Sequence, residues 1–268
     1  MKSEITLEET KKLLLEMLTE IDTFCQQKKI RYFLVGGTLL GAIRHNGFIP
    51  WDDDIDIGFP REDYNRFLKE FVSTSGHIKV IDFHNKENYI WSAAKAVDER
   101  TVLIENGNKK QSIGIFIDIF PLDKVAGSLE VAKKKQKKIN FWKNMLTLKY
   151  LRMEKDRSIV KNLAVLLGKL LFVVPDKRFL MQIEKLSTND INCDDCEYVC
   201  NFSGAWGERE IVKQVYFENI EQHKFEGHMF NIPSKYDAYL KTIYGDYMTL
   251  PPVEKRISHH GNVAYWKN

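Results

Sequence analysis

The stretch from Gly36 to Phe59 decides the fold and reads GGTLLGAIRHNGFIPWDDDIDIGF. It begins with paired glycines and ends in an acidic cluster of aspartates, namely Asp52, Asp53, Asp54 and Asp56. From Asp54 onward, acidic and apolar residues alternate, which is the period of a half-buried strand. We therefore expect Asp54 and Asp56 to project from one face of a strand and Ile55 and Ile57 from the other.

Two carboxylates side by side on a strand indicate a bound cation. At a separation of about 4 Å and an effective dielectric constant of about 20, they repel each other by about 4 kcal/mol. Mg²⁺ is commonly held by one or two carboxylates together with substrate phosphates. Asp54 and Asp56 are thus predicted metal ligands, with Asp52 as a further candidate, and the pattern is typical of metal-dependent phosphoryl transfer.

Two other interpretations of the acidic cluster remain open. An acidic run is often a solvated loop, although the interleaved isoleucines and the preceding Trp51 argue against one here. An EF-hand calcium loop would also carry aspartates at its positions 1, 3 and 5. That loop needs Gly and Glu at two later positions, where this chain has Ile57 and Asp63.

The paired glycines follow the short apolar segment RYFLV (31–35), which is predicted to be a strand. Gly36 and Gly37 allow tight backbone geometry and close approach of a ligand. Thr38 is expected to cap a helix that runs to about Arg44. Because a glycine turn at a helix N-terminus is a ready anion site, all four residues are candidate phosphate contacts.

A lone acid, Asp118, interrupts the apolar segment IGIFIDIFPLD (113–123). Burying a carboxylate among Ile and Phe is unfavourable without compensation. We expect Asp118 to lie on a strand beside the acidic strand and to be a third metal ligand and catalytic residue with Asp54 and Asp56. The alternative is a hydrogen-bonded aspartate at a strand end.

A lone cation, Lys95, interrupts another apolar segment, WSAAKAV (91–97), in the same way. It is a candidate phosphate contact, and an exposed lysine on an edge strand is the alternative. Further strand-like segments are found at 78–83 and 101–104.

The composition excludes several classes of protein. With 268 residues, 44% of them hydrophobic, the chain can bury a sizeable core. Its 40 basic and 37 acidic residues leave a net charge of +3, so we expect no nucleic-acid partner. The start lacks the apolar core of a signal peptide, and the longest apolar run, near 163–174, is too short to span a membrane. A cytoplasmic location is expected.

Four cysteines, namely Cys25, Cys193, Cys196 and Cys200, are too few for a disulfide scaffold. The last three have the spacing C-x2-C-x3-C, which matches none of the zinc-finger patterns. We expect reduced structural thiols, with a structural metal as the alternative.

The chain changes character after residue 125, which predicts a catalytic core (1–125) and a mainly helical region (126–268). The segment 132–155 is a strongly basic helix, and the segment 159–175 is an apolar one. They are either a solvated and a core helix, or an interfacial segment held at the inner face of an anionic membrane. The tail at 239–260 concentrates aromatic and basic residues and is expected to fold back on the site.

Three segments together resemble the LicD family: GGTLLGAIRHNGFIPWDDDIDIGFPREDYNRF, GIFIDIFPLD and YGDYMTLPPVEKR. Bacterial members transfer phosphocholine from CDP-choline to cell-surface glycans or their lipid-linked precursors, and the fukutin-type ribitol-phosphate transferases share the core. The resemblance covers nearly the whole chain. It implies an α/β nucleotidyltransferase-like fold with a mixed sheet, and Mg²⁺ as the metal.

The family motif is a glycine turn, a D-x-D and a later lone acid. It maps onto Gly36, Gly37 and Thr38, onto Asp54 and Asp56, and onto Asp118. The resemblance implies transfer of phosphocholine from CDP-choline to a hydroxyl of a teichoic acid or lipopolysaccharide precursor, with release of CMP. Three alternatives remain open: another CDP-linked polyol phosphate as donor, a true nucleotidyltransferase, and a calcium-binding scaffold without activity.

If choline is the group transferred, its quaternary ammonium requires aromatic faces and a carboxylate. The candidates are Trp51, Tyr89, Trp91, Trp206, Tyr244 and Tyr247. Arg256 in the tail is a further candidate for binding the donor.

Overall fold

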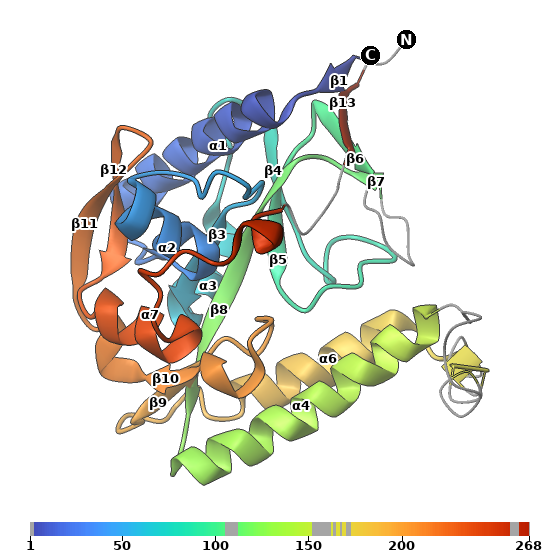
Figure 1. The fold of residues 1–268 in the computed structure, drawn as a ribbon. Coiled ribbons are helices and arrows are strands. Elements are labelled where there is room, and N and C mark those ends of the chain that lie inside the picture. The colour runs from blue at the N-terminus through green and yellow to red at the C-terminus, as the bar shows by residue number, and fades with distance from the viewer. Residues whose placement is uncertain are drawn as a thin grey trace.

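A seven-stranded mixed sheet forms the centre of the computed structural model, which describes residues 3–104, 112–151, 162, 165–166, 168–169, 173–257 and 263–267. Its main path runs β10–β9–β8–β3–β2, and β5 joins β8 and β4 to one another (Figure 1). The strands are β2 (Phe33–Leu34), β3 (Asp56–Pro60), β4 (Ile78–Ile81), β5 (Ala94–Asp98), β8 (Phe116–Val125), β9 (Tyr198–Cys200) and β10 (Ile211–Lys213). Only β3 and β8 pair in parallel among these strands, and the predicted α/β class is confirmed.

Three helices of the first half pack on this sheet: α1 (Leu7–Lys28), α2 (Gly36–His45) and α3 (Arg61–Glu70). The predicted capping box of α1 is present, since Thr6 Oγ1 accepts from the Glu9 N–H and the Glu9 carboxylate accepts from the Thr6 N–H. The apolar stripe of α1 contacts the core with fully buried Leu14, Leu18 and Ile21. These local signals fix the helix that supports the sheet.

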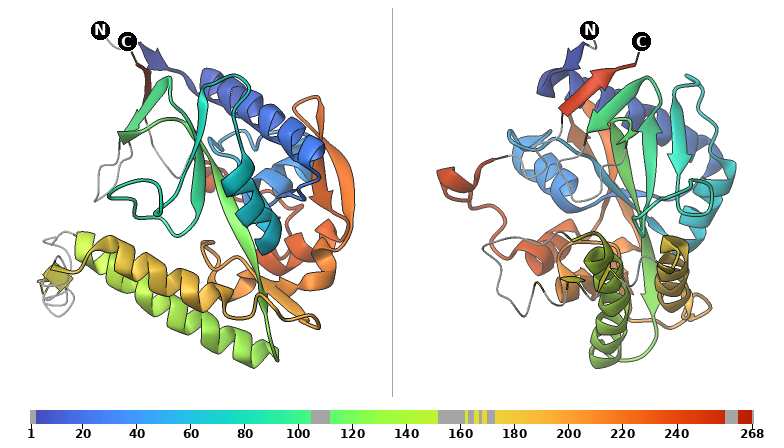
Figure 2. Two further views of the ribbon diagram at one scale, coloured as in Figure 1. Left: turned by 180° about the vertical axis from the view of Figure 1, so that it is seen from behind. Right: turned by 90° about the vertical axis from the view of Figure 1, so that its right-hand side faces the viewer.

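The second half contributes more strands than the sequence predicts. Two of its helices, α4 (Leu129–Tyr150) and α6 (Asp176–Thr188), run side by side as one arm (Figure 2). Its strands β9 and β10 extend the central sheet, and β11 (Ile220–Phe225) and β12 (His228–Pro233) form a hairpin. The division predicted at residue 125 therefore cuts through one continuous sheet. The helix predicted at 159–175 lies largely outside the described residues.

The ends of the chain meet in a second sheet of order β1–β13–β6–β7 (Figure 1). Its strands are β1 (Glu4–Ile5), β6 (Thr101–Ile104), β7 (Ser112–Ile113) and β13 (Val263–Trp266). Before β13, the helix α7 (Tyr236–Tyr244) packs against α2. The sequence predicts that the tail folds back on the site, and its described residues do return to α2, the helix that begins at the paired glycines. In the described part of the chain, no helix is long and apolar enough to cross a membrane.

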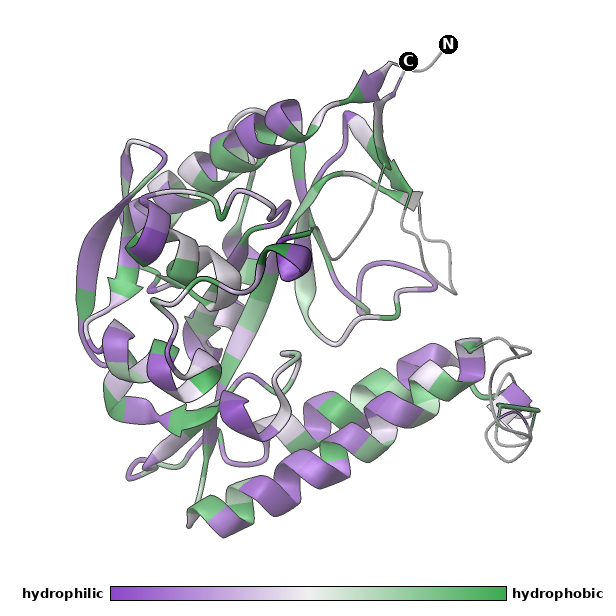
Figure 3. Cartoon of the chain, viewed as in Figure 1, coloured by the Kyte–Doolittle hydropathy of each residue, from purple (hydrophilic) through white to green (hydrophobic). Residues whose placement is uncertain are grey.

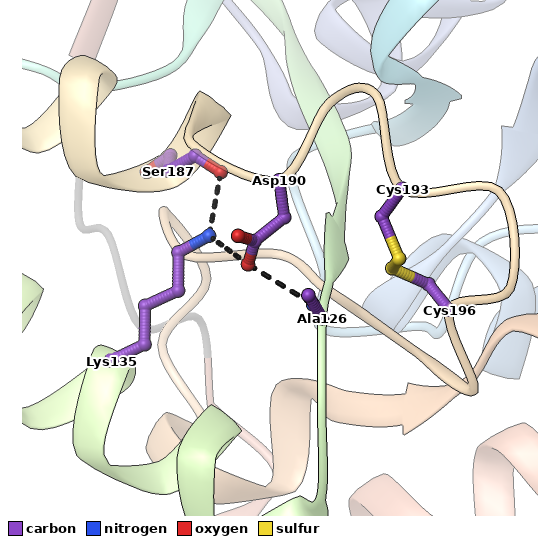
Figure 4. The surroundings of a disulfide bond; sticks show 6 residues. All are labelled: Ala126, Lys135, Ser187, Asp190, Cys193 and Cys196. Carbon is purple, nitrogen blue, oxygen red and sulfur yellow. Dashed lines mark hydrogen bonds and ion pairs between the residues drawn. A yellow bond between two sulfur atoms is a disulfide. The ribbon is translucent and has the colours of Figure 1, made fainter.

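Cys193 and Cys196 form a disulfide in the turn between α6 and β9 (Figure 4), so the expectation of reduced thiols is wrong for this pair. Their Cα atoms lie 5.8 Å apart, a separation that a disulfide can bridge. Cys25 and Cys200 are not disulfide-bonded and are buried. Cys200 Sγ donates to Gln136 Oε1 at 3.2 Å, so this thiol is part of the packing beneath α4.

A buried ion pair anchors α3 to β8 beside the site. Arg61 donates from Nε and Nη2 to the two carboxylate oxygens of Asp123 at 2.6 and 2.9 Å, and both side chains are at most 8% exposed. Removing one partner leaves the other charge buried and unpaired. We expect Asp123→Ala to lower the free energy of unfolding by about 3–5 kcal/mol in urea titrations.

The matched control is Glu8→Ala, which removes the exposed ion pair of Glu8 with Lys12 on α1. That change should alter the free energy of unfolding by less than about 1 kcal/mol. An equal decrease in the free energy of unfolding in both variants would show that the buried ion pair stabilises the protein no more than an exposed one.

Candidate active site

The parallel pairing of β3 with β8 places two of the predicted acids side by side. Asp56 and Asp118 are register partners, and the Asp118 N–H donates to the Ile55 carbonyl at 2.9 Å. Partnered residues of neighbouring strands point to the same face of a sheet. The strand begins at Asp56, however, so Asp54 lies two residues before it and outside the strand predicted to contain it.

The four clustered aspartates create a strongly negative field. Carboxylate oxygens of Asp52, Asp53 and Asp54 lie within 4.8 Å of one another, whereas the predicted triple of Asp54, Asp56 and Asp118 does not form such a group in the described part of the chain. Burial raises the pKa of Asp56 well above its usual range, and the charges of Asp54, Asp118 and Asp52 raise it further. Since a cation would relieve this repulsion and all the donors are hard oxygens, these residues fit Mg²⁺.

The paired glycines lie directly against these carboxylates. Gly36 has a φ of +54°, and a Cβ atom there would lie 2.8 Å from Asp56 Oδ2. A Cβ on Gly37 would lie 3.0 Å from Asp52 Oδ2. Only glycine tolerates both the backbone conformation and the contact at position 36. The glycine corner and the acids are therefore one site, as the sequence predicts.

Thr38 does not cap α2 as the sequence predicted, but contacts β3. The helix α2 begins at Gly36, its N-cap is Val35, and it has no side-chain cap. Thr38 Oγ1 instead accepts from the Asp56 N–H at 2.8 Å. The predicted capping role is wrong because the N-cap is Val35, three residues earlier. The Thr38 hydroxyl instead fixes the start of β3 relative to α2.

Lys95 is buried and paired, which excludes the exposed edge lysine. It is 3% exposed, and β5 has partners on both sides. Its Nζ donates to Asp118 Oδ1 at 2.6 Å and lies 3.4 Å from the ring centroid of Phe116 and 5.0 Å from that of Trp91. The anion that compensates this lysine is thus the carboxylate of its register partner.

Three residues predicted to bind the donor, Arg44, Trp51 and Arg256, lie where the C-terminal tail passes α2. Arg44 Nη1 donates to the Tyr247 carbonyl at 2.8 Å. The Arg256 guanidinium lies 5.8 Å from the ring centroid of Trp51 and donates through Nε to the Pro251 carbonyl. Arg44, Trp51 and Arg256 therefore gather where the tail passes α2. The Tyr247 ring is 7% exposed and belongs to the core.

Sequence reasoning missed two buried polar side chains near the acids, Tyr239 and Glu210. The Tyr239 hydroxyl accepts from the Gly36 N–H at 3.3 Å and so ties α7 to the glycine corner. Glu210, in a short 3-10 helix (Gly207–Glu210), accepts from the Trp206 N–H at 3.3 Å. Burial raises the pKa of Glu210 to about 7. No local pattern marks either residue, because only the packing of the second half buries them.

Glu210 should give the stability of the protein a distinct pH dependence. An unfolded glutamate ionises near 4.5, whereas the folded one keeps its proton until about 7. The free energy of unfolding should therefore fall by up to about 3 kcal/mol as the pH rises from 4.5 to about 7. Above that pH, Glu210 should contribute little further change. Urea titrations across this range should show the fall in the wild type and its loss in Glu210→Gln. The exposed neighbour provides the control, since Glu208→Gln should keep the wild-type slope.

The comparisons with known proteins agree with this site. Residues 29–162 match the family model described as the LicD/FKTN/FKRP nucleotidyltransferase domain. The chain is 33% identical over 266 residues to the lipopolysaccharide cholinephosphotransferase LicD of Haemophilus influenzae, covering 97% of this chain and 98% of that protein.

More distant similarity is found to the ribitol 5-phosphate transferases FKRP of mouse and human. Each is 33% identical over 92 residues, which are 34% of this chain and 17% of the relative. The residues matched by the domain model, 29–162, include the glycine corner and the acidic strand pair of this chain. This chain belongs to the LicD family.

Proposed function

We propose that this protein is a transferase that moves phosphocholine from CDP-choline to a hydroxyl of a lipopolysaccharide or teichoic acid type of glycan precursor and releases CMP. The observation that carries the proposal is the register of Asp56 with Asp118 beside the glycine corner. The full-length similarity to a cholinephosphotransferase supports the choice of the transferred group.

The acids Asp54, Asp56 and Asp118, together with Asp52, would hold Mg²⁺. The half-buried Asp56 supports this assignment, since desolvation and the neighbouring carboxylates make its charged form unfavourable without a cation. When bound, Mg²⁺ supplies neutralisation of charge on the donor pyrophosphate and on the departing CMP.

The other residues bind and orient the reactants. The backbone N–H groups of Gly37 and Thr38 lie in the first turn of α2, where they have no acceptor within the helix, and would bind phosphate oxygens. Arg44 and Arg256 would contact the nucleotide from the tail side. Transfer of this kind depends chiefly on positioning and charge neutralisation.

Asp118 would orient the acceptor hydroxyl and take its proton. The hydroxyl oxygen then forms a bond to the β-phosphorus while the bond from that phosphorus to the bridging oxygen breaks, and CMP leaves with the bonding electrons. Lys95 holds the Asp118 carboxylate through the contact at 2.6 Å and so acts as a positioning residue, in place of the direct phosphate contact expected from its sequence position.

The similarity to the FKRP ribitol 5-phosphate transferases favours one second candidate, in which the donor is a CDP-linked polyol and the group transferred is a polyol phosphate. The experiment that separates the candidates incubates the purified protein with CDP-choline, CDP-ribitol and CDP-glycerol, with Mg²⁺ or with EDTA. We expect CMP from CDP-choline with Mg²⁺ and none with EDTA. A preference for a polyol donor would refute choline, and release of pyrophosphate from a nucleoside triphosphate would indicate a true nucleotidyltransferase. Calcium binding without any turnover would support the scaffold.

We also propose that α4 holds the enzyme at the inner face of an anionic membrane, where a polyprenyl-linked acceptor would be presented. The exposed residues Val131, Lys134, Lys138 and Phe141 recur at helical spacing and so share one face of α4. Figure 3 shows hydrophilic and hydrophobic residues interspersed along this helix. Phe141 is 54% exposed, which suits an aromatic ring at a lipid interface flanked by lysines.

This proposal predicts binding to vesicles that contain phosphatidylglycerol and none to vesicles of phosphatidylcholine alone. Each lysine near an anionic surface contributes about 1 kcal/mol, so the double variant Lys134→Glu, Lys138→Glu should bind at least about tenfold more weakly in co-sedimentation. Lys12→Glu on α1 is the matched control, because Lys12 is exposed but lies on another element. Equal binding by wild type and double variant would exclude α4 as the contact.

A further inference from the structure

The aromatic candidates for a choline pocket differ in what lies against each ring. Trp51 already faces the Arg256 guanidinium, and Trp91 faces the Lys95 ammonium at 5.0 Å. A ring that carries one protein cation is poorly suited to bind a second, because the two positive charges repel each other.

The rings of two further candidates, Tyr89 and Tyr247, are buried in the core. The Tyr89 ring is 2% exposed and its hydroxyl donates to the Ala93 carbonyl at 2.6 Å. The Tyr247 hydroxyl donates to Asp237 at 2.8 Å, and its ring is also buried. Neither ring offers a face to a ligand.

The remaining pair, Trp206 and Tyr244, forms an open corner. Their ring centroids lie 5.0 Å apart with an interplanar angle of 78°, so the two faces meet nearly at a right angle. Trp206 is 45% exposed. Among the described residues, no lysine or arginine is placed over either ring. The edge of one ring therefore points at the face of the other, and the exposed part of Trp206 offers aromatic surface to a small cation at this corner.

A carboxyl group lies behind this corner. Glu210 is 6% exposed, and its Oε1 accepts from the Trp206 N–H. The Gly204 turn packs so closely on it that a Cβ atom there would collide with Oε1. Lys143, whose charge lowers the pKa of Glu210, donates to the carbonyls of Phe202, Ser203 and Gly204. The carboxyl is therefore held in place without a direct ion pair to this lysine.

The corner is connected to the acidic site through α7. It is carried by α7, which contacts α2, and Tyr239 of the same helix bonds to the Gly36 N–H beside Asp56. Burial raises the pKa of the Tyr244 phenol, and the carboxyls of Asp56, Glu210 and Asp52 contribute to the rise. The Tyr244 hydroxyl thus lies in the field of both the acidic cluster and Glu210.

We propose that Trp206, Tyr244 and Glu210 form a subsite for a quaternary ammonium group, which would hold the trimethylammonium of choline while its phosphate lies at the aspartates. This inference rests on the proposed function for the identity of the ligand. The two rings would supply cation–π attraction. The bound cation would favour the ionised form of the Glu210 carboxyl, whose pKa is about 7 in the free protein, and would so gain an opposite charge.

The test measures binding and turnover separately. Binding of choline and of tetramethylammonium is followed by calorimetry, and the KM for CDP-choline is compared with that for CDP-ethanolamine. We expect Trp206→Leu to raise the dissociation constants of choline and of tetramethylammonium. It should also raise the KM for CDP-choline about tenfold or more. The KM for CDP-ethanolamine should change less. Trp206→Phe should retain most of the affinity for choline and tetramethylammonium. Glu210→Gln should lower that affinity while the protein stays folded.

The control is Val72→Ala, which removes an exposed apolar side chain that follows α3. If the wild type releases CMP from CDP-choline but Trp206→Leu and Glu210→Gln leave binding and KM unchanged, the subsite is refuted and the proposed function stands. If tetramethylammonium binds through Trp206 but CDP-choline is not a donor, the proposed function fails and the subsite stands. If neither binding nor turnover is found in the wild type, both are refuted.

Discussion

Replacing Asp56 by Asn should reduce CMP release from CDP-choline by about a thousandfold or more, since a preorganised charged group is removed from the point where charge develops. Asp56 contacts each of the other parts of the site. Its N–H is held by Thr38, its carboxylate lies against Gly36, and its register partner is Asp118. No other aspartate of the cluster combines these contacts.

The same replacement should leave the fold intact. Burial and the charges of Asp54, Asp118 and Asp52 raise the pKa of Asp56, so an ionised carboxylate there destabilises the folded protein without a cation. In EDTA, Asp56→Asn should therefore unfold at the same temperature as the wild type or a higher one. Mg²⁺ should raise the unfolding temperature of the wild type and not that of the variant.

The control for this variant is Asp194→Asn, an exposed aspartate in the turn between α6 and β9. It should keep wild-type turnover and the wild-type response to Mg²⁺. Full turnover by Asp56→Asn would remove the basis of the proposed function.

Gly36→Ala is expected to give the second largest effect, a loss of turnover of about a hundredfold or more, because small displacements of reacting groups have effects of this size. The new Cβ atom would lie 2.8 Å from Asp56 Oδ2 and would displace that carboxylate. The left-handed backbone at position 36 adds about 1–2 kcal/mol of strain for any residue other than glycine.

Gly76→Ala separates these two contributions. Gly76 also has a positive φ, of +72°, but a Cβ atom there has no neighbour within 4 Å. Both variants should therefore lose similar stability in urea titrations, and only Gly36→Ala should lose turnover. If the two variants keep equal turnover, the contact between Gly36 and Asp56 has no part in the reaction.

Part of the site follows from local patterns. The glycine pair after a short strand, the alternation from Asp54 and the lone acid at Asp118 predicted that acids from two strands meet beside a glycine corner. The prediction works because a carboxylate inside an apolar strand needs a partner, and neighbouring strands are the nearest source of one.

Other predictions failed where a partner distant in the sequence decides the outcome. Lys95 is recognisable as an unusual residue in an apolar strand, but its anion is Asp118, which only the antiparallel register of β5 with β8 brings opposite to it. Strand β11 reads IEQHKF and is mostly exposed, so it carries no apolar alternation that would reveal a strand. The bond between Cys193 and Cys196 depends on the turn that brings them together.

The sequence by itself determined the α/β class, the first helices and the acids around the glycine corner, because these depend on periodicity, caps and backbone freedom within a few residues. The tertiary structure alone decided which groups surround those acids. Glu210, Tyr239 and the corner of Trp206 and Tyr244 reach the site through β9, β10 and α7, and their burial depends on contacts between halves of the chain. Burial and register are properties of the assembled sheet, and no window of sequence contains them.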